Sequence, residues 1–146
     1  MFAKLKPRNT DTPTIEHEPR EMDLDLALVM IDGGTAAQTQ WTIGSVTQSA
    51  LDFNGDILQI LGSLILVSFG AFTEKHNSDR LRADFVKRLA IEHAIFVRVL
   101  HGKLHVQCGV FGCQERKSYT AIPQNFHALM IKLTALQPGE IYEQHT

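Results

Sequence analysis

The sequence has 146 residues, of which 44% are hydrophobic and 21% are charged, as is usual for a single globular domain. The formal net charge of −2 gives no basic surplus, which argues against nucleic acid as a partner. Neither measure excludes a membrane component, because a local apolar segment decides that question.

The first 23 residues are rich in Pro, Thr, Glu and Arg and contain few apolar residues. We therefore expect a flexible tail at 1–23, followed by one globular domain at 24–146. The positive residues near the start are not followed by an apolar core, so this segment does not have the pattern of a secretion signal. The sequence predicts a cytoplasmic protein with reduced cysteines.

A short apolar run at residues 24–31 predicts a strand, because a turn signal, Asp32-Gly33-Gly34, follows it. The segment from Val29 to Thr35 resembles the first phosphate-binding loop of the actin-like and sugar-kinase ATPases. That resemblance implies an acidic residue acting through a metal ion and glycines that let backbone amides approach phosphate. The alternative is a tight turn in which Thr35 caps the next helix.

Residues 57–73 contain no charged side chain and predict a central apolar helix at about 55–73. On a helix, the polar and small residues of this region form one narrow stripe. Such a helix suits the core of a bundle. It also suits a membrane span at 57–73, with the carboxyl-terminal half inside the cell because Lys and Arg follow the span.

Three further elements complete the predicted fold. An amphipathic helix is expected at about 79–100, with His93 on its apolar face as a core histidine or, alternatively, a general base. A β-hairpin is expected at 103–122 with its turn at 109–112, and a final helix from Pro123 to just before Pro138. The predicted fold class is α+β, dominated by helices.

Imidazole and thiolate groups recur at a spacing that suggests a metal site. Tetrahedral zinc takes such ligands, and the candidates are His101, His105, Cys108 and Cys113. The alternatives are a redox pair of the two cysteines facing each other across the hairpin, or two ordinary thiols with solvated histidines.

No group of residues has the pattern of a catalytic site, so the sequence favours a protein that is not an enzyme and has no cofactor. The predicted function is a small binding or regulatory protein that contacts a protein partner or its own copies through apolar helix faces. Trp41 and Phe111 are the candidate contact residues. Two alternatives remain open: a single-pass component of the inner membrane, and a zinc-binding protein.

Overall fold

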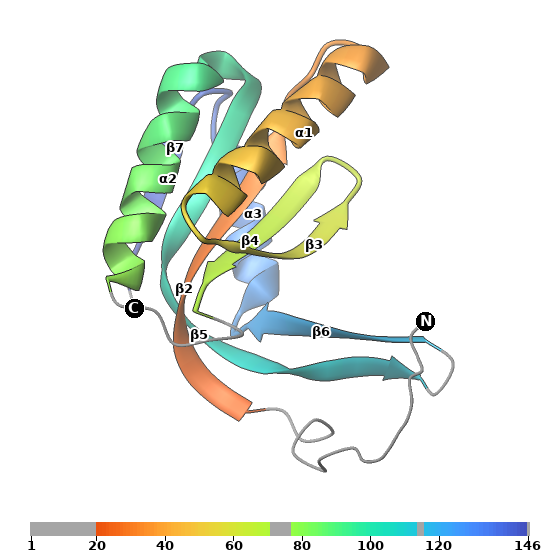
Figure 1. The fold of residues 1–146 in the computed structure, drawn as a ribbon, viewed down its shortest axis with the longest axis vertical. Coiled ribbons are helices and arrows are strands. Elements are labelled where there is room, and N and C mark those ends of the chain that lie inside the picture. The colour runs from red at the N-terminus through yellow and green to blue at the C-terminus, as the bar shows by residue number, and fades with distance from the viewer. Residues whose placement is uncertain (1–19, 71–76, 114–115, 146) are drawn as a thin grey trace.

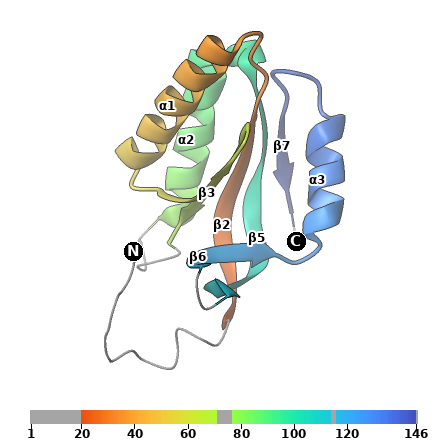
Figure 2. The ribbon, with the colours of Figure 1, turned by 90° about the vertical axis from the view of Figure 1, so that its right-hand side faces the viewer.

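One mixed sheet with helices on both faces makes up the fold (Figures 1 and 2). The structure is a computed structural model that describes residues 20–70, 77–113 and 116–145. Six strands lie in the order β3-β4-β2-β5-β6, with β7 beside β5. The elements are β2 (Arg20–Ile31), α1 (Ala36–Asp52), β3 (Asp56–Leu61), β4 (Leu64–Phe69), α2 (Ser78–Glu92), a 3-10 turn (Ala94–Phe96), β5 (Val97–Cys113), β6 (Arg116–Pro123), α3 (Phe126–Ala135) and β7 (Ile141–Gln144).

The two longest strands, β2 and β5, form the centre of the sheet. They pair antiparallel over the whole of β2, from Arg20 opposite Cys108 to Ile31 opposite Val97. The other edge of β5 pairs in parallel with β7 and then, from Val106 on, antiparallel with β6. The predicted strand at 24–31 is confirmed, and β2 begins four residues earlier, within the segment expected to be a tail. The rest of that tail lies outside the described residues.

Alternate residues of the central strands belong to two separate hydrophobic cores, because successive side chains point to opposite faces of the sheet. On one face, α1 and α2 cover Val29, Val67 and Val99, and Phe69 meets Phe85 of α2 with ring centroids 5.7 Å apart. On the other face, α3 places Leu129 and Leu133 over Leu26 and leucines of β4 and β5. Figure 2 shows α3 alone on that second face.

The predicted central helix is wrong, because residues 57–69 form the hairpin of β3 and β4. Gly62 has φ of 61°, a left-handed conformation that favours glycine, and it lies with Ser63 in the turn between the two strands. Two apolar strands, of which β4 is buried and β3 is largely exposed, read as one long apolar run when the turn between them carries no charge. The fold is consequently dominated by its sheet, and the helix-dominated fold class is contradicted.

The membrane interpretation is also contradicted. Within 20–70, 77–113 and 116–145, no helix is long and apolar enough to cross a bilayer. The segment proposed as a span lies instead at the edge of the sheet, apart from 71–73, which fall outside the described residues. A single-pass component with its span at 57–73 is therefore incompatible with this fold.

The predicted helix at 79–100 is correct only in its first two thirds. The helix α2 ends at Glu92, and from Val97 the chain continues as β5, whose Val97 and Val99 are buried on the α2 side. The hairpin at 103–122 is confirmed by the pairing of β5 with β6, although 109–112 extend the strand instead of turning. The closing helix is confirmed, starting at Phe126.

Candidate functional site

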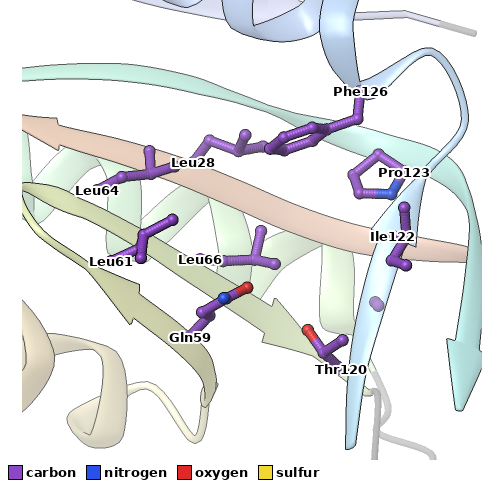
Figure 3. A pocket seen from close by; sticks show the side chains of 10 residues that line it. Leu28, Gln59, Leu61, Leu64, Leu66, Thr120, Ile122, Pro123 and Phe126 are labelled. Carbon is purple, nitrogen blue, oxygen red and sulfur yellow. The ribbon is translucent and has the colours of Figure 1, made fainter. Parts of the chain in front are cut away.

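A slot with a volume of about 300 Å³ opens on the sheet face that α3 only partly covers. Figure 3 shows it between the β3–β4 hairpin on one side and β6 with the start of α3 on the other. Its lining residues are uncharged: Leu28, Gln59, Leu61, Leu64, Leu66, Thr120, Ala121, Ile122, Pro123 and Phe126. Mostly apolar clefts of this size are typical of small-molecule sites.

The walls of the slot are apolar and partly bare. Leu28 and Leu66 belong to the core beneath the slot, whereas the side walls carry Leu61, Ile122 and Phe126, exposed by 64%, 42% and 39%. Covering exposed apolar side chains around a concavity lowers the free energy, so these walls favour the binding of a ligand. A flat apolar or aromatic group is the shape that two facing walls of this kind accommodate.

Two polar side chains, Gln59 and Thr120, line the same end of the slot (Figure 3). Thr120 Oγ1 is buried, and it has no hydrogen-bond partner among the described residues. A buried hydroxyl without a partner costs free energy, which a ligand with a matching donor or acceptor recovers. The exposed amide of Gln59 can donate and accept at once.

The predicted zinc ligands do not come together. All four lie on β5, but His101 and His105 point to the α2 side of the sheet, whereas Cys108 is buried in the core beneath α3. Cys113 is exposed at the end of the strand. Within the described ranges, no group of three or more His, Cys, Asp or Glu is placed to hold a metal ion. The zinc prediction is therefore wrong, because a strand alternates its side chains between two faces.

Three of the four predicted zinc ligands have their pKa shifted by neighbours or by burial in ways that do not involve a metal. His101 is buried beside Arg82, and burial, followed by the Arg82 charge, lowers the pKa of its imidazole. His105 is hydrogen-bonded to Glu21 at 2.9 Å and to Asp23 at 3.0 Å, and these two bonds raise the pKa of its imidazole. Burial raises the pKa of the Cys108 thiol, which favours an unreactive, protonated sulfur.

The turn after β2 caps α1 and is bound to Arg98 of β5. Thr35 Oγ1 accepts a hydrogen bond from the backbone N–H of Gln38 and caps α1, which confirms the cap. Asp32 binds Arg98 through both oxygens, at 2.6 and 2.9 Å. Arg98 also donates to the backbone oxygens of Thr134 and Leu136, at the end of α3. This turn therefore joins the sheet to α3.

The remaining sequence candidates are dispersed. His93 is a core histidine, as expected: it is buried, its Nε2 lies 3.1 Å from Ser45 Oγ, and burial lowers its pKa. Trp41, on α1, is 67% exposed, and its ring centroid lies 6.0 Å from that of His93. Phe111 is half-buried on β5. Contact with a partner by Trp41 or Phe111 stays a prediction.

Sequence reasoning missed Gln59 and Thr120 because no local pattern marks either residue. They lie 61 positions apart, on strands at opposite ends of the path β3-β4-β2-β5-β6. Only the sheet brings β3 and β6 to one slot. The one signal in the sequence is Gln59, a polar residue inside an apolar run, and helical spacing places it on the polar stripe of the predicted helix.

No known family model and no curated protein matches the sequence. The fold does match solved structures. The adenylyl cyclase CyaB from P. aeruginosa superposes with a TM-score of 0.67 over 88% of this chain and 79% of that chain, at 17% identity. The guanylate cyclase domain of RhGC from Catenaria anguillulae, in complex with GTP, gives 0.68 over 85% and 79%, at 12% identity.

A dimeric guanylyl cyclase domain of the RhoGC fusion protein from Blastocladiella emersonii also matches, with a TM-score of 0.66 over 85% of this chain and 80% of that chain, at 11% identity. Homo-oligomers therefore occur among proteins of this fold. The expectation of a non-enzymatic regulatory protein is contradicted by these likenesses, because the similar structures are enzymes. At these identities the comparisons establish the fold, and the chain has the fold of nucleotidyl cyclases.

Proposed function

We propose that the protein binds a purine nucleotide, with the base in the slot, and acts as a nucleotidyl cyclase domain. The observation that carries this proposal is an apolar slot on a cyclase fold in which Thr120 Oγ1 is buried and has no hydrogen-bond partner among residues 20–70, 77–113 and 116–145. The similar structures include an adenylyl cyclase and a guanylate cyclase domain in complex with GTP, and adenine and guanine are both purines.

A purine ring fits the chemistry of the slot. Its faces are apolar and suit contact with Leu61, Ile122 and Phe126, while its edge carries donors and acceptors for Gln59 and Thr120. A glutamine amide forms paired hydrogen bonds with the edge of adenine, and it can do the same with the O6 and N1–H groups of guanine. The slot therefore supports recognition of purines as a class.

The phosphates need groups outside the slot, because none of its ten lining residues is charged. Divalent ions that accompany nucleoside triphosphates prefer carboxylate oxygens, and the slot lining provides none. Within this chain, the described slot residues bind and orient the base. We propose that a second copy supplies charge for the phosphates, in keeping with the homo-oligomer expected from the sequence and with a cytoplasmic location.

Equilibrium binding of nucleosides tests the base-binding role without the phosphates. We expect adenosine or guanosine to bind more tightly than cytidine, with an affinity that a chelator does not change. The isosteric changes Thr120→Val and Gln59→Met should each weaken purine binding by about 3- to 10-fold, as expected for one lost hydrogen bond. Titration calorimetry measures both effects.

Gln48→Met, on the exposed surface of α1, is the matched control and should leave the affinity unchanged. Thr120→Val should also leave the fold as stable as before, because the lost hydroxyl has no partner within the part of the chain that the structure describes. Purine binding that both slot variants retain in full would contradict the site. Conversion of ATP or GTP to its cyclic nucleotide, measured at increasing protein concentration with Mg²⁺, tests the enzymatic half separately.

A further inference from the structure

The carboxyl-terminal strand β7 has an unusual attachment to the sheet. It has four residues, and it pairs in parallel with β5 in a sheet whose other pairings are antiparallel. Glu143 forms an ion pair with Arg82 of α2 at 3.2 Å, and Tyr142 accepts a hydrogen bond from Lys132 of α3 at 3.1 Å. Both helical layers therefore hold one short strand.

Polar atoms without partners are buried where β7 covers β5. His101, which pairs in register with Glu143, is 6% exposed and its Nδ1 has no partner among the described residues. Arg82 Nε and Gln144 Oε1 are also buried and also have no hydrogen-bond partner among the described residues. Each such atom reduces the free energy gained when the strand docks.

We propose that β7 is a strap that detaches from β5 in mild acid, and that the imidazole of His101 is the group that takes up the proton. His101 lies on the α2 side of the sheet beside the Arg82 charge, and β7 pairs along the edge of β5 at this residue, so detachment opens that edge to water. The charged and titratable groups around His101 are Arg82 from α2, Glu143 from β7, His145 just beyond β7, Lys103 along β5, and Asp25 of β2, which binds both Arg82 and Lys103.

The direction of the pH effect follows from these neighbours. Burial and the Arg82 charge lower the pKa of His101 in the docked state, and Glu143 opposes them only in part. Detachment of β7 relieves burial, the largest of these causes, so the pKa of the imidazole rises toward its usual value of 6.5, although Arg82 stays beside it and Glu143 is lost. The detached state therefore binds more protons below that pH, so acid favours it, by at most tenfold per pH unit for one proton.

Gly102 allows an independent test of the docking of β7. A Cβ at this position would collide with the backbone oxygen of Gln144, so only glycine lets β7 approach β5 so closely. Gly102→Ala should prevent docking at every pH. Gly44→Ala on α1 is the matched control, because a Cβ there meets nothing within 4 Å.

Hydrogen exchange of the full chain between pH 5 and 8, corrected for intrinsic exchange, tests the proposal. We expect protection of peptides covering 97–104 and 140–145 to fall by up to tenfold per unit below about pH 6.5, while the β2–β4 pairing serves as a constant reference. His101→Gln should remove the pH dependence, and Glu143→Gln should move detachment to higher pH.

Gly102→Ala should lose protection of 140–145 at all pH values, and Gly44→Ala should keep it. The strap is refuted if protection of 140–145 in the natural chain is independent of pH, or if Gly102→Ala leaves it intact. An unchanged pH dependence in His101→Gln would refute the assigned proton site, and if that variant fails to fold, the Glu143→Gln shift decides the same point.

Discussion

Asp25 is a buried carboxylate that two cations contact. It is 1% exposed, and its carboxylate accepts from Arg82 at 2.6 Å, Ser78 at 2.7 Å and Lys103 at 3.1 Å. A buried carboxylate is tolerated only with such partners, because desolvation of an isolated charge is very costly. Asp25 thereby joins β2 to the first turns of α2.

We expect Asp25→Asn to destabilise the protein by about 3 kcal/mol, since it leaves the buried guanidinium of Arg82 without its main counter-charge. Asp52→Asn is the control: its ion pair with Arg88 is exposed, and its loss should cost less than about 1 kcal/mol. Urea unfolding at neutral pH measures both. Equal losses in the two variants would show that burial does not determine the effect.

At single positions, the sequence predicted structural roles better than functional ones. Thr35 and His93 have the cap and the core environment that their neighbours in sequence indicated. A cap is a local interaction over three residues, so a local pattern contains it. Thr120 could not be found in this way, because its buried hydroxyl lacks a partner among the described residues and lines a slot that β3 and the start of α3 complete.

The hairpin of β3 and β4 differs more from its sequence-based prediction than the other elements do. Residues 57–69 read as a helix because polar residues happened to recur at helical spacing, while the turn contained neither Pro nor Asn. What distinguishes the hairpin is its pairing with β2, from Asp25 opposite Phe69 to Met30 opposite Leu64. That is tertiary information, and it overrides helical periodicity.

Two glycines test this element against a true helix. Gly62→Ala should destabilise the protein by about 1 kcal/mol, because its φ of 61° is left-handed. Gly44→Ala, within α1, should instead stabilise it by up to about 1 kcal/mol, since alanine is the better helix former. Thermal unfolding of the pair gives the two signs. Stabilisation by both changes would mean that residues 57–69 are helical after all.

Across the whole molecule, histidines in opposite environments set the response to pH. His93 has its pKa lowered, first by burial, so the folded state disfavours its charged form, and stability is lost as pH falls below about 6.5. His105 has its pKa raised, so its contribution is present below about 6.5 and is lost as pH rises through its folded pKa. These opposite slopes come from different parts of the fold, because His93 follows the end of α2 and His105 lies on β5 beside β2.

We expect His93→Gln to reduce the loss of stability between pH 7.5 and 5.5, because a neutral side chain in the core has no proton to take up there. His127→Gln, at an exposed position on α3, is the control and should keep the natural slope. Urea midpoints at the two pH values report the difference. A natural slope in His93→Gln would show that another group causes acid destabilisation.

The slot connects strands from the two ends of the sheet path, β3 and β6, without a hydrogen-bonded ladder between them. A ligand that occupies it connects the middle third of the chain to the last third. Free energy of occupation adds to the free energy of unfolding for both ends at once. A bound ligand should therefore slow proteolysis near both β3 and β6, so resistance to digestion reports how fully the slot is occupied.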